Sequence, residues 1–144
     1  MLDTLVNNDR LYVSVLDVKI GSPERFDVVI CKYPNRKDQY VKRVIGLPGD
    51  TLTVRRGVLY INGEEMAEPF LSEERTVFFD RGSNNFSIEI PEGQYFVMGD
   101  NRDDSNDSRR VGLISEDMMI GTVEYIIWPL DRIGKVAGSE EYAQ

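Results

Sequence analysis

Two stretches of the chain carry the side chains that could do chemistry. Residues 39–50 read QYVKRVIGLPGD and contain two adjacent cations, Lys42 and Arg43. Residues 99–109 read GDNRDDSNDSR and concentrate Asp, Asn and Ser side chains. The chain has no histidine, so neither a Ser-His-Asp triad nor a histidine-ligated zinc site can be built from it. If the protein catalyses hydrolysis, its base is therefore a lysine, a carboxylate or a bound metal.

Lys42 is the candidate base because of the strand that must position it. The alternation from Tyr40 to Val44 predicts a β-strand, which the turn at residues 46–49 ends. Successive side chains on a strand point to opposite faces, so Lys42 shares a face with Tyr40 and Val44 while Arg43 points away. A lysine base must be neutral near neutral pH, which requires its pKa to fall about three units from the ordinary value of about 10.4. Such a fall corresponds to a preference of ~4 kcal/mol for the uncharged amine. Burial against apolar neighbours can supply this shift. The alternative is a solvated lysine on an edge strand.

The polar loop at residues 99–109 has two plain interpretations. It fits a solvated loop whose Asp, Asn and Ser side chains bond to their own backbone. A calcium-binding loop is the second, because four carboxylates supply hard oxygen ligands. They are Asp100, Asp103, Asp104 and Asp107. However, the alternation and the terminal bidentate Glu of an EF-hand are missing, and Arg102 stands among the candidate ligands.

Composition narrows the class of protein. A chain of 144 residues fits one domain. Its net charge of −8 argues against binding to nucleic acid and against electrostatic docking on anionic lipid. Cys31 is the one cysteine and lies in a run, residues 28–31, that predicts a buried strand. It cannot form an internal disulfide, so the redox compartment stays open. No apolar run is long enough to cross a bilayer.

The pattern along the chain predicts an all-β fold of mostly antiparallel strands. Short alternating segments at close spacing, with few helical periods, are typical of this class. The strands are expected at 10–19, 26–33, 39–45, 51–55, 58–61, 76–79, 86–90, 94–98 and 120–128. Asn62 and Gly63 predict a hairpin turn, and 114–118 one helical turn capped by Ser115. The polar tail from residue 134 is expected to be frayed.

VKRVIGLPGD followed by GDNRDDSNDSR resembles the type I signal peptidases, which are membrane-bound Ser/Lys endopeptidases. Two shorter blocks agree with this. Residues 25–29, RFDVV, resemble the family's Arg-Gly-Asp-Val-Val with Phe26 in place of glycine. Residues 1–5, MLDTL, resemble the end of its Ser-Met-x-Pro-Thr-Leu with Asp3 in place of proline. The four blocks occur in the family's order, and the likeness extends to Trp128.

The resemblance implies roles for the residues of both stretches. Lys42 would be the general base, Ser105 would hydrogen-bond and orient it, and Asp107 would hold the loop of that serine. The structural residues implied are Arg43, Asp100 and Arg109. The first two would form an ion pair that clamps the central strand to the loop, and the third would act similarly. No metal or cofactor is expected.

The family's nucleophilic serine immediately precedes the methionine that matches Met1. No residue of the printed sequence stands at that position. We therefore expect residues 1–144 to be a soluble, single catalytic-domain fragment that is inactive alone. By the same resemblance, the full-length protein has a membrane span and resides in the bacterial plasma membrane, with the catalytic domain on the extracytoplasmic side.

The expected substrates are signal peptides of exported preproteins, cut after small residues at the first and third positions before the bond (−1 and −3). The pocket-lining positions implied are Met1, Leu5, Ile30, Tyr40 and Val41, for each of which core packing is the plain alternative. The membrane surface is a second expected partner, reached by apolar insertion. The candidates for insertion are Phe70, Leu71, Phe78, Phe79, Trp128 and Leu130. Residues 62–90 would form a short variable insertion or accessory lobe.

Two rival functions stay open. A non-catalytic relative could bind signal-like peptides or another protein through the same groove. Alternatively, the Ser/Lys chemistry could serve another substrate, as in self-cleaving repressors or the specialised pilin and plasmid-transfer peptidases. The GDNRDDSNDSR loop favours the general exporting enzyme over this second alternative.

Overall fold

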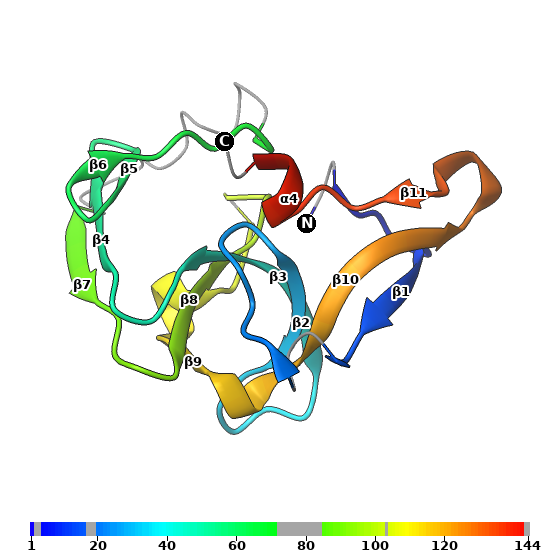
Figure 1. The fold of residues 1–144 in the computed structure, drawn as a ribbon, viewed down its shortest axis with the longest axis horizontal. Helices are drawn as coiled ribbons and strands as arrows, with labels where there is room; N and C mark the ends of the chain where they lie inside the picture. The colour runs from blue at the N-terminus through cyan, green and yellow to red at the C-terminus, as the bar shows by residue number, and fades with distance from the viewer. Residues whose placement is uncertain (2–3, 17–19, 72–84, 103, 143–144) are drawn as a thin grey trace.

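The computed structural model describes residues 1, 4–16, 20–71, 85–102 and 104–142, which form two antiparallel β-sheets (Figure 1). The large sheet has the strand order β1, β10, β2, β3, β8, β9, with β11 beside β10. Its strands are β1 (Arg10–Ser14), β2 (Val28–Lys32), β3 (Gln39–Gly46), β8 (Gln94–Met98), β9 (Ile114–Ser115), β10 (Met119–Trp128) and β11 (Gly134–Lys135). The small sheet has the order β6, β5, β4, β7. Its strands are β4 (Thr51–Arg55), β5 (Val58–Ile61), β6 (Glu64–Glu65) and β7 (Phe86–Glu89).

The all-β prediction is confirmed, and several strands keep their predicted bounds. β4, β5 and β8 match the predicted ranges, because each is an alternating run closed by turn residues. Asn62 and Gly63 have φ values of 54° and 87°, the left-handed conformation that a tight hairpin turn requires. The expected strand at 76–79 lies outside the described residues.

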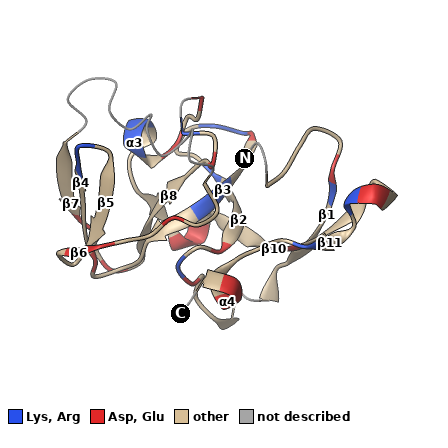
Figure 2. Cartoon of the chain, turned by 90° about the horizontal axis from the view of Figure 1, so that it is seen from above, with Lys and Arg blue, Asp and Glu red and all other residues tan. Residues whose placement is uncertain are grey.

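β3 lies in the interior of the large sheet and links it to the small one. It pairs with β2 through Gln39 to Arg43 and with β8 from Arg43 onward. In both views the small sheet lies at one end of the molecule and β1, β10 and β11 at the other, with β3 between them (Figures 1 and 2). The side chains of β3 therefore contribute to all three apolar clusters of the fold.

Each cluster meets a different part of β3. The first joins the two sheets and comprises Phe26, Ile45, Leu52, Val54, Leu59, Ile61, Ile90, Phe96 and Met98. The second lies on the face of Val44 and comprises Val29, Cys31, Tyr33, Val44, Tyr95, Val97, Ile114 and Met119. The third comprises Leu5, Val28, Val123, Ile126 and Val136, with Met1, Ile30 and Val41 packed against it.

The C-terminal prediction was wrong, because the tail is packed rather than frayed. β11 pairs with β10, and α4 (Ser139–Tyr142) follows it. Val136 and Ser139 are buried, and the Ser139 N–H donates to Asp27 at 3.2 Å. The polar composition of the tail concealed these contacts, since only two of its larger side chains, Val136 and Tyr142, pack in apolar clusters and backbone groups provide the others.

Two local predictions also need correction. The loop at 99–109 is not wholly irregular, because α3 (Ser108–Val111) begins within it. At 114–118 the structure has β9 and the 3₁₀ turn η2 (Glu116–Met118), and Ser115 precedes that turn without a side-chain capping bond. A second 3₁₀ turn, η3 (Leu130–Arg132), follows β10. None of the helices in the described part of the chain is both long and apolar enough to span a bilayer.

Candidate active site

Lys42 is buried on β3, with only 9% of its surface exposed. Its Nζ donates a hydrogen bond to Ser105 Oγ at 3.2 Å. Within the described parts of the chain, no carboxylate forms an ion pair with Lys42. Burial lowers the pKa of Lys42, and the charge of nearby Asp107 only partly opposes this effect. The solvated-edge alternative for Lys42 therefore does not describe its surroundings.

The strand side chains that share a face with Lys42 are apolar or neutral. Val29 lies opposite Lys42 on β2, and Val44 follows it on the same face of β3. Cys31 is also close, but burial raises the pKa of its thiol to about 12, so the thiol stays neutral. A neutral thiol gives little support to an ammonium. Burial therefore remains the largest influence on the pKa of Lys42 and lowers it.

Gly99 allows Lys42 and Ser105 to meet. A Cβ placed on Gly99 would overlap the Ser105 side chain and come within 3.6 Å of Lys42 Nζ. Any larger residue would therefore displace the serine or the lysine. The sequence offered a signal, since the glycine opens the polar loop, but its role depends on contacts with residues far along the chain.

Asp107 holds the loop that presents Ser105. Its Oδ2 accepts from the Gly99 N–H at 3.0 Å, and its Oδ1 accepts from the Arg109 N–H at 3.2 Å at the start of α3. Arg109 also pairs with Asp107 through its side chain at 2.8 Å. Burial alone would raise the pKa of Asp107, but hydrogen bonds from Arg109, Gly99 and Ser105 bring it below its usual value. Asp107 is therefore a charged anchor for the loop.

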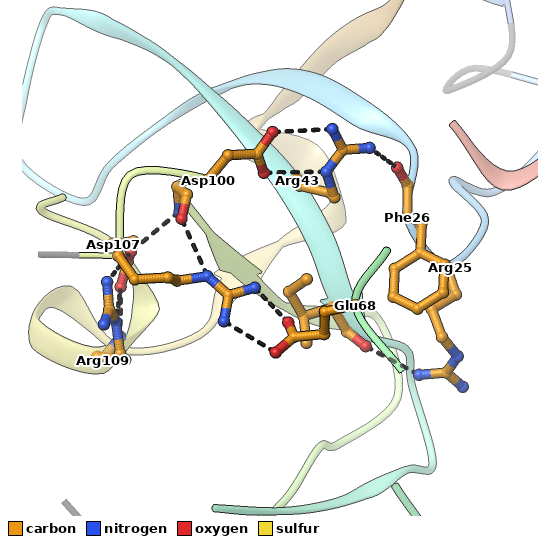
Figure 3. A network of polar contacts seen from close by, with 10 residues as sticks. Arg25, Phe26, Arg43, Glu68, Asp100, Asp107 and Arg109 are labelled. Carbon is orange, nitrogen blue, oxygen red and sulfur yellow. Dashed lines mark hydrogen bonds and ion pairs between the residues drawn. The ribbon is translucent and has the colours of Figure 1, made fainter. Parts of the chain in front are cut away.

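Arg43 points to the opposite face of β3 and pairs with Asp100 (Figure 3). The two bonds, Nε to Oδ1 and Nη2 to Oδ2, measure 3.0 and 2.8 Å, and both side chains are buried. Arg43 Nη1 donates in addition to the carbonyl oxygens of Phe26 and Ala137. The guanidinium thus ties β3 to the polar loop, to the segment before β2 and to the C-terminal tail. Arg109, by contrast, joins Asp107 within the loop itself.

The five predicted pocket positions divide between two faces of β3. Met1, Leu5 and Val41 line a cavity of about 380 Å³, and Ile30 packs in the same cluster. Tyr40 lies on the Lys42 face instead, where its ring stacks on Tyr33 at 4.1 Å between centroids. Met1, the start of the chain, therefore lies beside the residue that precedes Lys42.

Tyr33 is a site residue that the sequence did not reveal. Its hydroxyl donates to the carbonyl oxygen of Asn106, next to Ser105 in the loop. The same ring stacks on Tyr40, two residues before Lys42. Tyr33 thus bridges the strand and the loop from the side of β2. Its position after a strand and before a Pro-Asn turn gave no sign of this role.

The two edges of β3 are paired over different lengths. β2 pairs with Gln39 through Arg43, whereas β8 pairs only from Arg43 onward. Within the described residues, the other edge of residues 39–42 has no strand partner. The described part of the chain also holds no group of three or more His, Cys, Asp and Glu side chains placed to bind a metal.

Comparisons with known proteins point to one family. The family model described as "Signal peptidase, peptidase S26" matches residues 1–128. Signal peptidase I T of Bacillus subtilis (strain 168) is 41% identical over 138 residues, which cover 92% of this chain and 72% of that protein. Signal peptidase IB of Staphylococcus aureus (strain Mu50 / ATCC 700699) is 38% identical over 138 residues, covering 88% of this chain and 72% of that protein.

The crystal structure of a signal peptidase I from Enterococcus faecalis V583 has a similar fold. It superposes with a TM-score of 0.60 and 34% identity, covering 69% of this chain and 95% of that one. The family model matches residues 1–128, and the curated relatives are about 40% identical to the chain. The chain therefore belongs to the signal peptidase family, peptidase S26, a family of serine endopeptidases.

Proposed function

We propose that residues 1–144 are the catalytic domain of an endopeptidase that removes signal peptides from exported preproteins with a Ser/Lys dyad. Lys42 is the general base, and the nucleophile is a serine immediately before Met1. The observation that carries the proposal is the buried amine of Lys42, which hydrogen-bonds Ser105 at 3.2 Å and has no carboxylate partner among the residues that the structure describes. The first residue of the chain lies beside the same strand.

The proposed chemistry uses the lowered pKa of Lys42 twice. The neutral amine takes the proton of the serine hydroxyl as the serine oxygen attacks the scissile carbonyl carbon. The resulting ammonium then gives a proton to the nitrogen of the departing mature chain. Water hydrolyses the acyl-enzyme ester with the amine again as base. Ser105 accepts an N–H of the amine throughout, so the lone pair is aimed at the nucleophile.

The proposed substrate binds as an added strand. An extended peptide would pair with the open edge of β3 at residues 39–42 and direct alternate side chains to one face. The cavity lined by Met1, Leu5 and Val41 includes a residue of this same part of β3. By the family resemblance, the side chains at −1 and −3 are small.

The proposed membrane contact lies at the end of β10 and in the turn after it. Four apolar side chains gather there with 46–71% of their surfaces exposed: Ile127, Trp128, Leu130 and Ile133. Of the sequence candidates, Trp128 and Leu130 belong to this group. Phe70 instead packs against Phe26 at 5.2 Å, and Phe78 and Phe79 lie outside the described residues. The acidic net charge makes apolar insertion the mode of contact.

A cleavage assay with two forms of the protein tests the proposal. Residues 1–144 alone should not cleave a signal-peptide substrate, whereas a longer form with a serine before Met1 should. In the longer form, Lys42→Ala should lower the rate by about 10²–10⁴-fold, as expected for a lost general base. Lys32→Ala, at an exposed position on β2, is the matched control and should keep full activity.

Each other outcome contradicts the proposal in its own way. Full activity in Lys42→Ala would remove Lys42 from the mechanism. Tight peptide binding without turnover in the serine-bearing form would favour the non-catalytic binder. Self-cleavage without turnover of signal peptides would favour a relative of the self-cleaving repressors.

A further inference from the structure

Glu68 lies outside both signature stretches, in the segment that follows β6, yet it makes an ion pair with the polar loop. Its two carboxylate oxygens accept from the two terminal nitrogens of Arg102, one of them at 3.2 Å. Only 1% of the Arg102 side chain and 8% of the Glu68 side chain are exposed. Figure 3 shows Glu68 in the same polar network as Asp100 and Asp107.

Arg102 links Glu68 to the backbone of Gly99. Its Nε donates to the Gly99 carbonyl oxygen at 3.1 Å. The N–H of the same Gly99 donates to Asp107 at 3.0 Å. Gly99 is therefore held at both its polar groups. Because Gly99 is in direct contact with Ser105 and close to Lys42 Nζ, a movement of this residue moves the hydrogen bond between them.

A second, independent contact fixes the segment that carries Glu68. The Phe70 ring lies 4.2 Å from the Arg43 guanidinium and packs against Phe26 and Tyr142. Glu68 and Phe70 thus attach one short segment to two arginines, Arg102 in the polar loop and Arg43 on β3. Since buried bidentate pairs have little freedom, this attachment restricts the loop more than a surface ion pair would.

We propose that Glu68 is a positioning residue for the Lys42–Ser105 pair, acting through Arg102 and Gly99. The proposal deepens the proposed function and rests on it for the activity readout. Loss of the carboxylate removes the bidentate partner that holds the buried Arg102 guanidinium, so Arg102 holds the Gly99 carbonyl less firmly. The Lys42–Ser105 bond loosens, and water reaches the amine.

The first experiment measures cleavage by the serine-bearing form with Glu68→Gln, which preserves size and one acceptor. We expect kcat to fall on the order of 10-fold with KM unchanged, because the catalytic pair is misplaced while the peptide groove is intact. Glu68→Asp, which keeps the charge, should recover part of the loss. Glu65→Gln, at an exposed position of β6, is the matched control and should leave kcat unchanged.

The second experiment needs no cleavage, so it distinguishes failure of this proposal from failure of the proposed function. NMR titration of labelled lysine in residues 1–144 reports the pKa of Lys42 in the wild type and in Glu68→Gln. We expect the variant to move that pKa upward, toward the ordinary value. The groups that act on the amine are unchanged in the variant: Cys31 on β2, Asp100 and Asp107 in the loop, and Arg109 on α3.

The outcomes are decisive together. A lower kcat and a shifted Lys42 pKa in a folded Glu68→Gln protein support the positioning role. An unchanged kcat and an unchanged pKa overturn it. So does a loss of activity that only follows the loss of folded protein in thermal melts, since that result assigns Glu68 a purely structural role.

Discussion

Lys42 and Arg43 are adjacent on β3, yet the two faces of the strand treat their charges in opposite ways. Arg43 binds one carboxylate through Nε and Nη2, and its Nη1 donates to two carbonyl oxygens. Among the described residues, Lys42 donates to a neutral hydroxyl and packs on its strand face against apolar or neutral side chains. Both side chains are buried, but their partners differ. The Asp100 carboxylate offsets the cost of burying the Arg43 guanidinium, whereas burial lowers the pKa of Lys42 and nearby charges only partly oppose it.

Of the substitutions that test this contrast, Arg43→Met should have the largest effect, which is on the stability of the fold. Arg43→Met removes the cation and leaves Asp100 buried without its partner. We expect the free energy of unfolding to fall by about 3–5 kcal/mol, the usual consequence of breaking a buried pair from one side. Urea unfolding followed by circular dichroism measures it. Lys32→Met is the exposed control, and a loss in Arg43→Met no larger than in this control would refute the clamp.

Ser105→Ala acts on the other face and should affect catalysis rather than folding. It removes the hydroxyl that accepts from the Lys42 amine and leaves the burial of the strand unchanged. We expect kcat of the serine-bearing form to fall on the order of 10²-fold, because the amine is no longer aimed. Ser87→Ala, at an exposed position on β7, serves as control. Wild-type kcat in Ser105→Ala would show that the hydroxyl does not orient the base.

Phe26, whose carbonyl oxygen accepts from Arg43, gives a further prediction with a smaller effect on stability. It replaces the family's glycine but keeps a positive φ of 76°, where a side chain is strained. The ring is held by Phe70 and Tyr142, at centroid distances of 5.2 and 6.3 Å. The aromatic contacts thus offset a backbone conformation suited to glycine.

This account predicts an inverted order for two substitutions. Phe26→Gly and Phe26→Ala both lose the ring contacts, but only alanine keeps a Cβ at positive φ. The glycine variant should therefore be the more stable of the two by about 1 kcal/mol, measured by urea unfolding. Equal stability, or a more stable alanine variant, would show that the backbone there is relaxed.

The strands could be predicted from the sequence because their signals are local. β4 and β5 are alternating runs separated by turn residues, and the face shared by Lys42 and Val44 follows from the period of a strand. The pairing of Lys42 with Ser105 spans 63 residues, and only the family resemblance suggested it. Nothing in the local pattern joins those two positions.

The contacts that sequence reasoning missed share a physical cause. Tyr33 binds a backbone carbonyl of the loop, and Arg43 binds a backbone carbonyl of the tail, so no side-chain type marks either acceptor. Glu68 lies in a charged segment that is typical of a solvated surface, and only the fold brings Arg102 to it. Such partners are set by tertiary packing, which an alternating pattern does not encode.

The most direct test of the central claim is the pKa of Lys42 itself. An NMR titration of residues 1–144 with labelled lysine, assigned by the signal lost in Lys42→Met, measures it without substrate or nucleophile. A lysine whose pKa is lowered on folding binds fewer protons in the native state, so stability rises with pH between the folded pKa and the unfolded value of about 10.4. We predict that Lys42 titrates below about 10.4 in the folded protein and near that value in urea. A folded-state pKa at or above about 10.4 would contradict the account, because burial would then not disfavour the charged form of Lys42.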